Sequence, residues 1–228
     1  VVSGYWNEMN TNVDITVPLA NDNSLVGGTV QIRAKIDANS YINVEAAETI
    51  QSSHITAGTI DVRIDKSDVG NNGLEELTNF ANGGVITFNA ILTDLAGNST
   101  TGTASTTTLT IDTTAALVSS VSSTTTDGIY KTGENIEVDI TFNDNVTLTG
   151  GTLDITMESG LVDNSISITT ITSSNTASKT YTVQSGDSNA DLFVKTLAVS
   201  GGYLIDIAGN PMSTADLTIA ASSNMNDS

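Results

Sequence analysis

The residues best suited to chemistry belong to a five-residue motif that occurs twice. Asp94–Asn98 reads Asp-Leu-Ala-Gly-Asn and Asp206–Asn210 reads Asp-Ile-Ala-Gly-Asn, with the two aspartates 112 positions apart (206 − 94). Each Asp carboxylate can accept backbone N–H groups and close a turn in which the glycine takes a positive φ. The same carboxylate and the Asn side-chain oxygen are also hard ligands of the kind that Ca²⁺ prefers. The motif therefore predicts either a self-contained turn or part of a calcium site.

Three further acids extend the calcium hypothesis. Asp112 follows the last strand pattern of the first half, and Asp127 and Glu134 flank the expected opening hairpin of the second half. If these oxygens converge with the first motif, a bound Ca²⁺ would relieve the repulsion among the carboxylates and fix the angle between the halves. Separate, solvated acids are the alternative. The candidate metal ligands are Asp94, Asn98, Asp112, Asp127, Glu134, Asp206 and Asn210.

Catalysis has little support in the sequence, and we expect neither catalytic residues nor a cofactor other than Ca²⁺. His54 is the single histidine, which argues against Ser–His chemistry and multi-histidine metal sites, and we expect it in a loop or at a strand end. Paired acids such as Glu75 and Glu76, or Asp187 and Asp191, suit a glycosidase. With 4% aromatic residues and one Trp, however, the chain offers little with which to line a sugar-binding cleft.

The charge of the chain excludes one large class of partners. Its formal net charge is −19, from 26 acids and 7 bases, and the acids divide evenly between residues 1–115 and 116–228, with 13 in each. No basic stripe is present to neutralise phosphates, so we expect no nucleic-acid binding. No apolar stretch approaches the length of a membrane-spanning segment, and we expect no membrane insertion. The absence of cysteine excludes disulfides and thiolate metal sites.

The elements that must position these residues are β-strands. Apolar and polar residues alternate over 29–36, 60–64, 86–92 and 136–142, which predicts strands with one buried and one solvated face. Turn-rich segments such as Gly150–Gly151 and Gly201–Gly202 separate the strand patterns. The exception is Leu74–Ala81, where the spacing of apolar residues predicts a short helical turn. Short strands with regular turns indicate an all-β chain of antiparallel sandwiches.

The duplicated motif indicates two tandem domains. A strand pattern ends at Ile111, and a new alternating segment begins at Leu117, so we place the domains at residues 1–115 and 116–228. Little else is shared between the halves, which suggests two subtypes of one architecture. Because few residues separate the flanking strands, we expect restricted motion at the hinge.

Both halves resemble Ig-like, or cadherin-like, tandem repeats of large bacterial cell-surface and secreted adhesins. In the first half the resemblance rests on Asp94–Asn98 followed by Ile111–Ala115, although Ala116 stands where such repeats commonly have Pro. In the second half it rests on Asp127–Glu134, on Tyr181–Asp187 and on Asp206–Asn210. The resemblance implies two Ig-like sandwiches and a non-catalytic extender role outside the cell or at the bacterial surface. It also implies Ca²⁺ at or near the domain junction.

Fold analogy alone does not determine function. The alternative is a module that binds carbohydrate or protein, possibly as an accessory part of a secreted enzyme. Trp6 with Tyr5, or Tyr41, could then provide a stacking platform. We expect the partners to be neighbouring repeats of the same polypeptide and a host or surface glycan or protein, with the chain itself monomeric.

Overall fold

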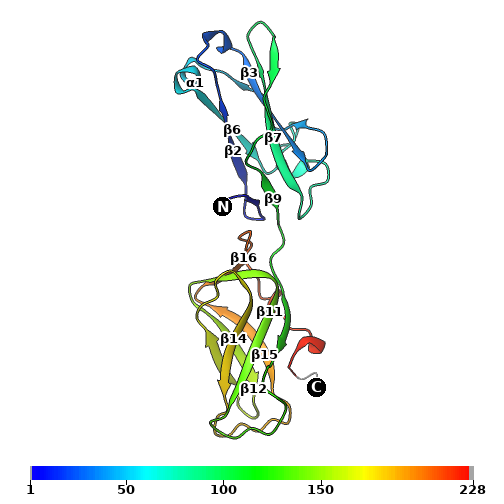
Figure 1. The fold of residues 1–228 in the computed structure, drawn as a ribbon, viewed down its shortest axis with the longest axis vertical. Coiled ribbons are helices and arrows are strands. Elements are labelled where there is room, and N and C mark those ends of the chain that lie inside the picture. The colour runs from blue at the N-terminus through cyan, green and yellow to red at the C-terminus, as the bar shows by residue number, and fades with distance from the viewer. Residues whose placement is uncertain (1, 226–228) are drawn as a thin grey trace. The chain divides into compact units, whose positions relative to one another are not determined.

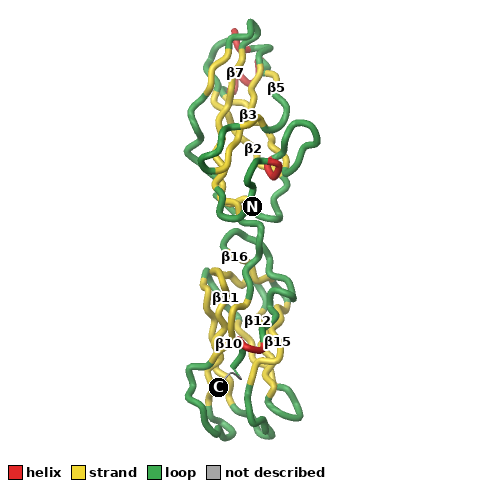
Figure 2. Tube along the Cα trace, turned by 90° about the vertical axis from the view of Figure 1, so that its right-hand side faces the viewer, coloured by secondary structure: helices red, strands yellow, loops and turns green. Residues whose placement is uncertain are grey.

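The computed structural model describes residues 2–225, and its contacts divide the chain into two compact units. Unit 1 comprises Val1–Thr113 and unit 2 comprises Thr114–Ser228. Strands joined by loops make up most of both units, with a few short helical turns (Figures 1 and 2). The prediction of an all-β chain is therefore confirmed.

Unit 1 contains strands at the three segments where alternation predicts them, residues 29–36, 60–64 and 86–92. Its strands are β1 (Tyr5–Trp6), β2 (Asn12–Pro18), β3 (Thr29–Ile36), β4 (Ile42–Asn43), β5 (Glu48–Thr49), β6 (Thr59–Asp65), β7 (Val85–Thr93), β8 (Ser99–Thr101) and β9 (Leu109–Ile111). Its helical turns are η1 (Asn23–Leu25), α1 (Ser52–Ala57) and η2 (Leu74–Glu76). One sheet has the order β1-β9-β7-β3-β4, with β5 pairing β3 and β8 pairing β7, and β2 pairs β6 in a second sheet.

The strand pattern of unit 1 places its core between these two sheets. In β3 the side chains at alternate positions, beginning with Val30 and ending with Ile36, are buried, and β6 repeats the pattern from Ile60 to Ile64. Trp6 is 1% exposed, because β1 pairs in parallel with β9 and turns the indole into this core. The Trp6 Nε1–H donates to Glu75 Oε1 at 3.0 Å. Period-two patterning thus accounts for the buried faces of β3, β6 and most of β7.

Two local expectations have different outcomes. The helical turn predicted within Leu74–Ala81 is present as η2, where Leu74 is buried. The placement of His54 in a loop or at a strand end was wrong, because His54 lies in α1. Its Nδ1 accepts the backbone N–H of Gln51 at 3.1 Å, so the ring caps the first turn of the helix.

Unit 2 is built from longer strands. They are β10 (Val118–Ser122), β11 (Asn135–Thr149), β12 (Thr152–Glu158), β13 (Asn164–Ile168), β14 (Ser174–Thr182), β15 (Phe193–Ser200) and β16 (Tyr203–Asp206), followed by η3 (Ala221–Ser223). One sheet has the order β10-β11-β14, with β16 pairing the end of β11, and a second has the order β13-β12-β15. Buried residues from both sheets, among them Phe142, Leu153 and Tyr181, form a separate core.

Candidate functional site

The first Asp-x-Ala-Gly-Asn motif closes on itself. Asp94 Oδ1 accepts the Asn98 backbone N–H at 2.8 Å, and Asp94 Oδ2 accepts the Asn98 side-chain amide at 2.8 Å. The backbone completes the turn: Asp94 N–H donates to the Asn98 carbonyl at 2.9 Å, and Gly97 N–H donates to the Asp94 carbonyl at 3.0 Å. Gly97 has a φ of 89°, which favours glycine at this position.

The second motif repeats this geometry. Asp206 Oδ1 accepts the Asn210 backbone N–H at 2.8 Å, and Oδ2 accepts the Asn210 side-chain amide at 2.9 Å. The corresponding backbone bonds are 3.1 Å from Asp206 N to Asn210 O and 3.2 Å from Gly209 N to Asp206 O. In both turns the Asn amide donates to the carboxylate of the same motif. The motif is therefore complete as a turn without an ion.

The two turns differ in burial. Asp206 is 4% exposed and Asn210 is fully buried, whereas Asn98 is exposed. The hydrogen bonds from the side chain and the backbone N–H of Asn98 lower the pKa of Asp94, because they stabilise its charged form. The same hydrogen-bonding pattern thus occurs once at the surface, in unit 1, and once buried, in unit 2.

The two candidate acidic ligands of unit 1, Asp94 and Asp112, lie at opposite ends of strand β7. Asp94 directly follows β7, whereas the start of β7 pairs with β9 through Val85 and Thr110. Asp112 follows β9, and its N–H donates to the Trp6 carbonyl at 2.8 Å. The nine residues of β7 span about 27 Å at a rise of about 3.4 Å per residue. Asp94 and Asp112 therefore cannot share one ion.

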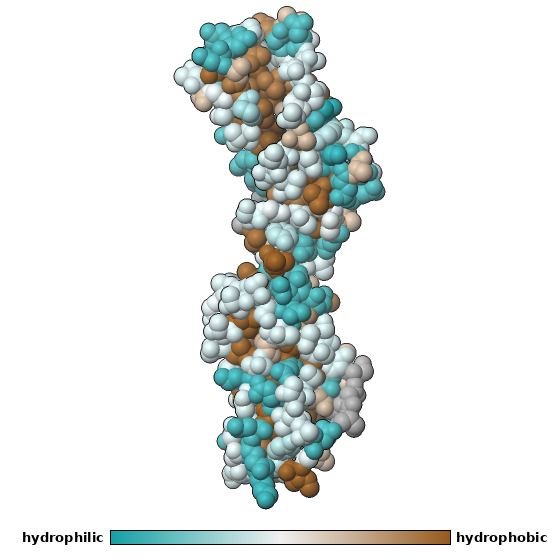
Figure 3. All heavy atoms as spheres, viewed as in Figure 1, coloured by the Kyte–Doolittle hydropathy of each residue, from teal (hydrophilic) through white to brown (hydrophobic). Residues whose placement is uncertain are grey.

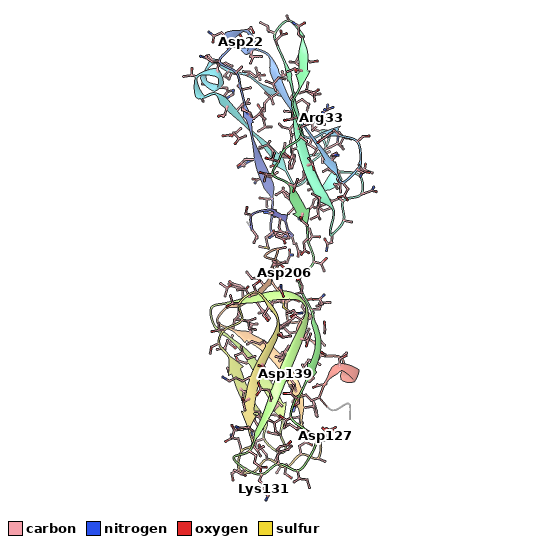
Figure 4. All side chains as sticks on the ribbon, viewed as in Figure 1. Asp22, Arg33, Asp127, Lys131, Asp139 and Asp206 are labelled. Carbon is pink, nitrogen blue, oxygen red and sulfur yellow. The ribbon has the colours of Figure 1, made fainter. Side chains whose placement is uncertain are left out.

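The candidate ligands of unit 2 also lie at opposite ends of a strand, β11. Asp206 pairs with Val146 near the end of β11, whereas Glu134 directly precedes the start of that strand. Glu134 Oε2 accepts the Lys131 N–H at 2.6 Å, within the loop that also holds Asp127. Figure 4 shows Asp206 at one end of unit 2, with Asp127 and Lys131 toward the other. The chain enters unit 2 at the end that holds Asp206, because Leu117 N–H bonds Asn143 Oδ1 at 2.7 Å.

The candidate ligands thus form no single cluster within either unit. Among residues 2–225, no three His, Cys, Asp or Glu side chains gather closely enough to hold a metal ion. The closed turns accord with the self-contained interpretation of the motif. Calcium binding by any of the seven residues stays a prediction.

Sequence reasoning missed a polar network in unit 2. The hydroxyl of Tyr181 donates to Asp187 Oδ2 at 2.6 Å, and the same oxygen accepts Gln184 N–H at 2.7 Å. The Asn164 amide donates to Asp187 Oδ1 at 2.8 Å. Burial raises the pKa of Tyr181, and its bond to Asp187 adds to the shift. The six-residue spacing from Tyr181 to Asp187 was the available signal, since it spans the end of one strand and a turn.

A second network lies on the outer face of β12. Asp154 accepts hydroxyl bonds from Ser167 and Ser200 at 2.6 Å and from Thr152 at 2.9 Å. These hydroxyls lower the pKa of Asp154. Because they come from three neighbouring strands or strand ends, the network joins β13, β12 and β15, and we interpret it as structural.

The proposed stacking aromatics have different surroundings. Trp6 is buried and its N–H is satisfied by Glu75, so its ring offers no open stacking surface. Tyr41 is half-buried beside two cations of unit 1, Arg33 and Lys35. On the face drawn in Figure 3, hydrophilic and near-neutral residues cover most of the surface, with smaller apolar areas between them.

Comparison with solved structures finds a distant likeness to a region of a bacterial adhesin. No family model and no curated protein matches the chain. A solved structure concerned with host cell surface retention of a 1.5-MDa bacterial ice-binding adhesin matches with 18% identity and a TM-score of 0.40. The match covers 90% of this chain and 55% of the other, and at this TM-score it carries no functional argument. Within residues 2–225, no helix is long and apolar enough to cross a membrane.

Proposed function

We propose that the chain is a non-catalytic extender segment of a bacterial surface or secreted adhesin. The observation that carries the proposal is the short connection between the units. Thr113 N–H donates to Asn82 Oδ1 of unit 1 at 2.9 Å, and Ala116 is 2% exposed within the core of unit 2. Thr114 and Ala115 are the residues between these two anchors. A connection of this length limits how far the units can move independently.

Each unit also has the features of a stable spacer. The cores are separate, and the duplicated turn satisfies its own carboxylate in both units. A module that folds by itself and has a short connection can be repeated in tandem, since each copy then adds length with little added hinge freedom. The sequence resemblance to adhesin repeats supports the same proposal.

The connection is tested by lengthening it. We expect insertion of a Gly-Ser-Gly-Ser segment between Thr114 and Ala115 to broaden the distribution of distances between spin labels placed in the two units. The matched control carries the same insertion between Asn71 and Asn72, in an exposed turn of unit 1, and should leave the distribution unchanged. If the unmodified chain is already as broad as the lengthened one, the extender proposal is wrong.

Calcium stiffening is a separate part of the proposal. If Ca²⁺ binds near the junction, EDTA should lower the melting temperature and broaden the same distance distribution, and added Ca²⁺ should reverse both changes. The turn geometry gives a control, because a turn closed by its own Asn amide should keep its hydrogen bonds in EDTA. No change in either measurement on chelation would remove calcium from the proposal and leave the extender role standing.

A further inference from the structure

A cationic face lies on unit 1, formed by Arg33, Lys35, Tyr41 and Asn89. Arg33 and Lys35 are two residues apart on the solvated face of β3, and Tyr41 directly precedes β4, which pairs with β3. The centroid of the Tyr41 ring lies 5.5 Å from the guanidinium carbon of Arg33 and 5.3 Å from Lys35 Nζ. Arg33 Nε donates to Asn89 Oδ1 on β7 at 3.1 Å. In Figure 4, Arg33 lies midway along unit 1, away from the end marked by Asp22.

Four of the seven bases form no ion pair within residues 2–225, and two of them, Arg33 and Lys35, lie on the same strand; the other two, Lys131 and Lys179, belong to unit 2. The chain has 26 acids and 7 bases, and Arg63, Lys66 and Lys195 each pair with a carboxylate. Within residues 2–225, neither Arg33 nor Lys35 forms an ion pair. Side chains at i and i+2 of a strand share one face and are separated by about 6–7 Å. The fold thus places two cations side by side on β3, although acids outnumber bases in the chain by 26 to 7.

The contacts orient the cations without neutralising them. The ring of Tyr41 attracts both cations through its quadrupole but carries no net charge. The Asn89 oxygen occupies Nε of Arg33 and leaves the two terminal nitrogens of the guanidinium for another acceptor. Within residues 2–225, neither Lys35 Nζ nor the Tyr41 hydroxyl donates a hydrogen bond to the protein. Donors and positive charge are therefore held together on a half-buried, solvated face.

The fold favours a ligand that binds to side chains of this face and not to the backbone of its strands. β3 pairs with β7 on one edge and with β4 and β5 on the other, and β7 pairs with β3, β8 and β9. Because β3 pairs at Arg33 with Asn43 of β4 and with Asn89 of β7, an extended peptide cannot pair its backbone with β3 at that position. A carboxylated sugar presents an anion for the Arg33 fork and ring hydroxyls for Asn89, Tyr41 and Lys35.

We propose that the cationic face of unit 1 binds a carboxylated polysaccharide of the uronate type. The carboxylate of one sugar pairs with the terminal nitrogens of Arg33, and Lys35 contacts the same or the next carboxylate. Asn89 and the Tyr41 hydroxyl contact sugar hydroxyls. This activity goes beyond the extender role and does not depend on it: the face lies within unit 1, and a spacer with or without a stiff hinge could carry it.

The probe is a defined oligogalacturonate, measured by titration calorimetry and by amide chemical shifts of the full chain. Saturable binding should shift amides of β3, β4 and β7 and weaken as salt screens the charges. The fully methyl-esterified oligosaccharide, which has the same ring hydroxyls without the anions, should lose at least tenfold in affinity, because it forfeits the charge-assisted bonds. Absence of saturable binding, or equal binding of the ester, would overturn the proposal.

Variants separate the cationic face from charge in general. Arg33→Gln with Lys35→Gln should weaken oligogalacturonate binding about tenfold or more. The matched control is Arg63→Gln, on the exposed face of β6 where Arg63 pairs with Asp14 at 3.2 Å, and it should bind as the unmodified chain does. Amide spectra of each variant confirm folding. Equal losses in both variants would contradict a defined site, and equal binding of a poly-glutamate peptide would indicate an unspecific anion surface instead of a glycan site.

Discussion

The duplicated turn allows one structural device to be tested in two environments of the same molecule. Asn98→Ala and Asn210→Ala each remove a side-chain amide that donates to the carboxylate of the preceding Asp at 2.8 Å and 2.9 Å respectively. The backbone bonds of both turns can remain. The two changes differ in burial, since Asp206 and Asn210 are buried and Asn98 is exposed.

The expected magnitude in the buried turn follows from the charge left behind. A hydrogen bond to a charged group contributes about 1.5–3 kcal/mol, and a buried acceptor that loses its partner carries the larger cost. We expect Asn210→Ala to lower the free energy of unfolding of unit 2 by about 2–3 kcal/mol. This corresponds to roughly a 30- to 160-fold change in the unfolding equilibrium. In the surface turn, water replaces the Asn98 amide, so its removal should cost far less.

The assay is urea denaturation monitored by amide cross-peaks that are assigned separately to each unit. With an m-value of about 1.5 kcal/mol/M, the midpoint of unit 2 should fall by about 1–2 M in Asn210→Ala, while that of unit 1 stays in place. Asn98→Ala should move the midpoint of unit 1 only slightly. Equal shifts in the two variants would refute the reasoning, because burial would then not control the strength of the Asp–Asn contact.

Three further outcomes are expected. Tyr181→Phe removes the 2.6 Å hydrogen bond from a buried ring to Asp187. It should lower the free energy of unfolding of unit 2 by about 1.5–3 kcal/mol in urea denaturation. An unchanged midpoint would show that water replaces the hydroxyl at no cost. Because hydroxyl donors lower the folded-state pKa of Asp154, its contribution to stability is present above the unfolded pKa and is lost as pH falls through the folded pKa. A carboxyl carbon titration by NMR should find its midpoint below that of a free Asp, and an ordinary midpoint would contradict the network. Gly28→Ala should destabilise unit 1 by about 1–3 kcal/mol, because the new Cβ would lie 2.1 Å from the Thr93 carbonyl oxygen. An unchanged melting temperature in calorimetry would mean that this backbone can shift freely.

The strands were accessible from sequence, and the arrangement of the acids was not. The alternation from Thr29 to Ile36 is reproduced residue by residue as β3, because period-two burial is a local property. By contrast, bringing Asp94 and Asp112 together depends on which ends of β7 and β9 meet, and antiparallel pairing places them at opposite ends. Strand topology is a long-range property that a motif does not encode.

The duplicated turn illustrates the same limit in its chemistry. The residue types of Asp94–Asn98 suit both a calcium ligand set and a closed turn, and their composition alone could not decide between them. The structure places the Asn amide on the carboxylate in both copies. The pairing of Tyr181 with Asp187 and the gathering of Arg33, Lys35 and Asn89 depend on neighbours from other strands or loops, so spacing within one strand could not have shown them.

The burial of Trp6 gives the chain an intrinsic optical reporter for one of its units. It is the single Trp of the sequence and lies in the core of unit 1, with its indole N–H on Glu75. Excitation at the red edge of indole absorption therefore follows the melting of unit 1 alone, while far-ultraviolet circular dichroism follows both units. A difference between the two melting curves would measure how independently the units unfold, with no label attached to the chain.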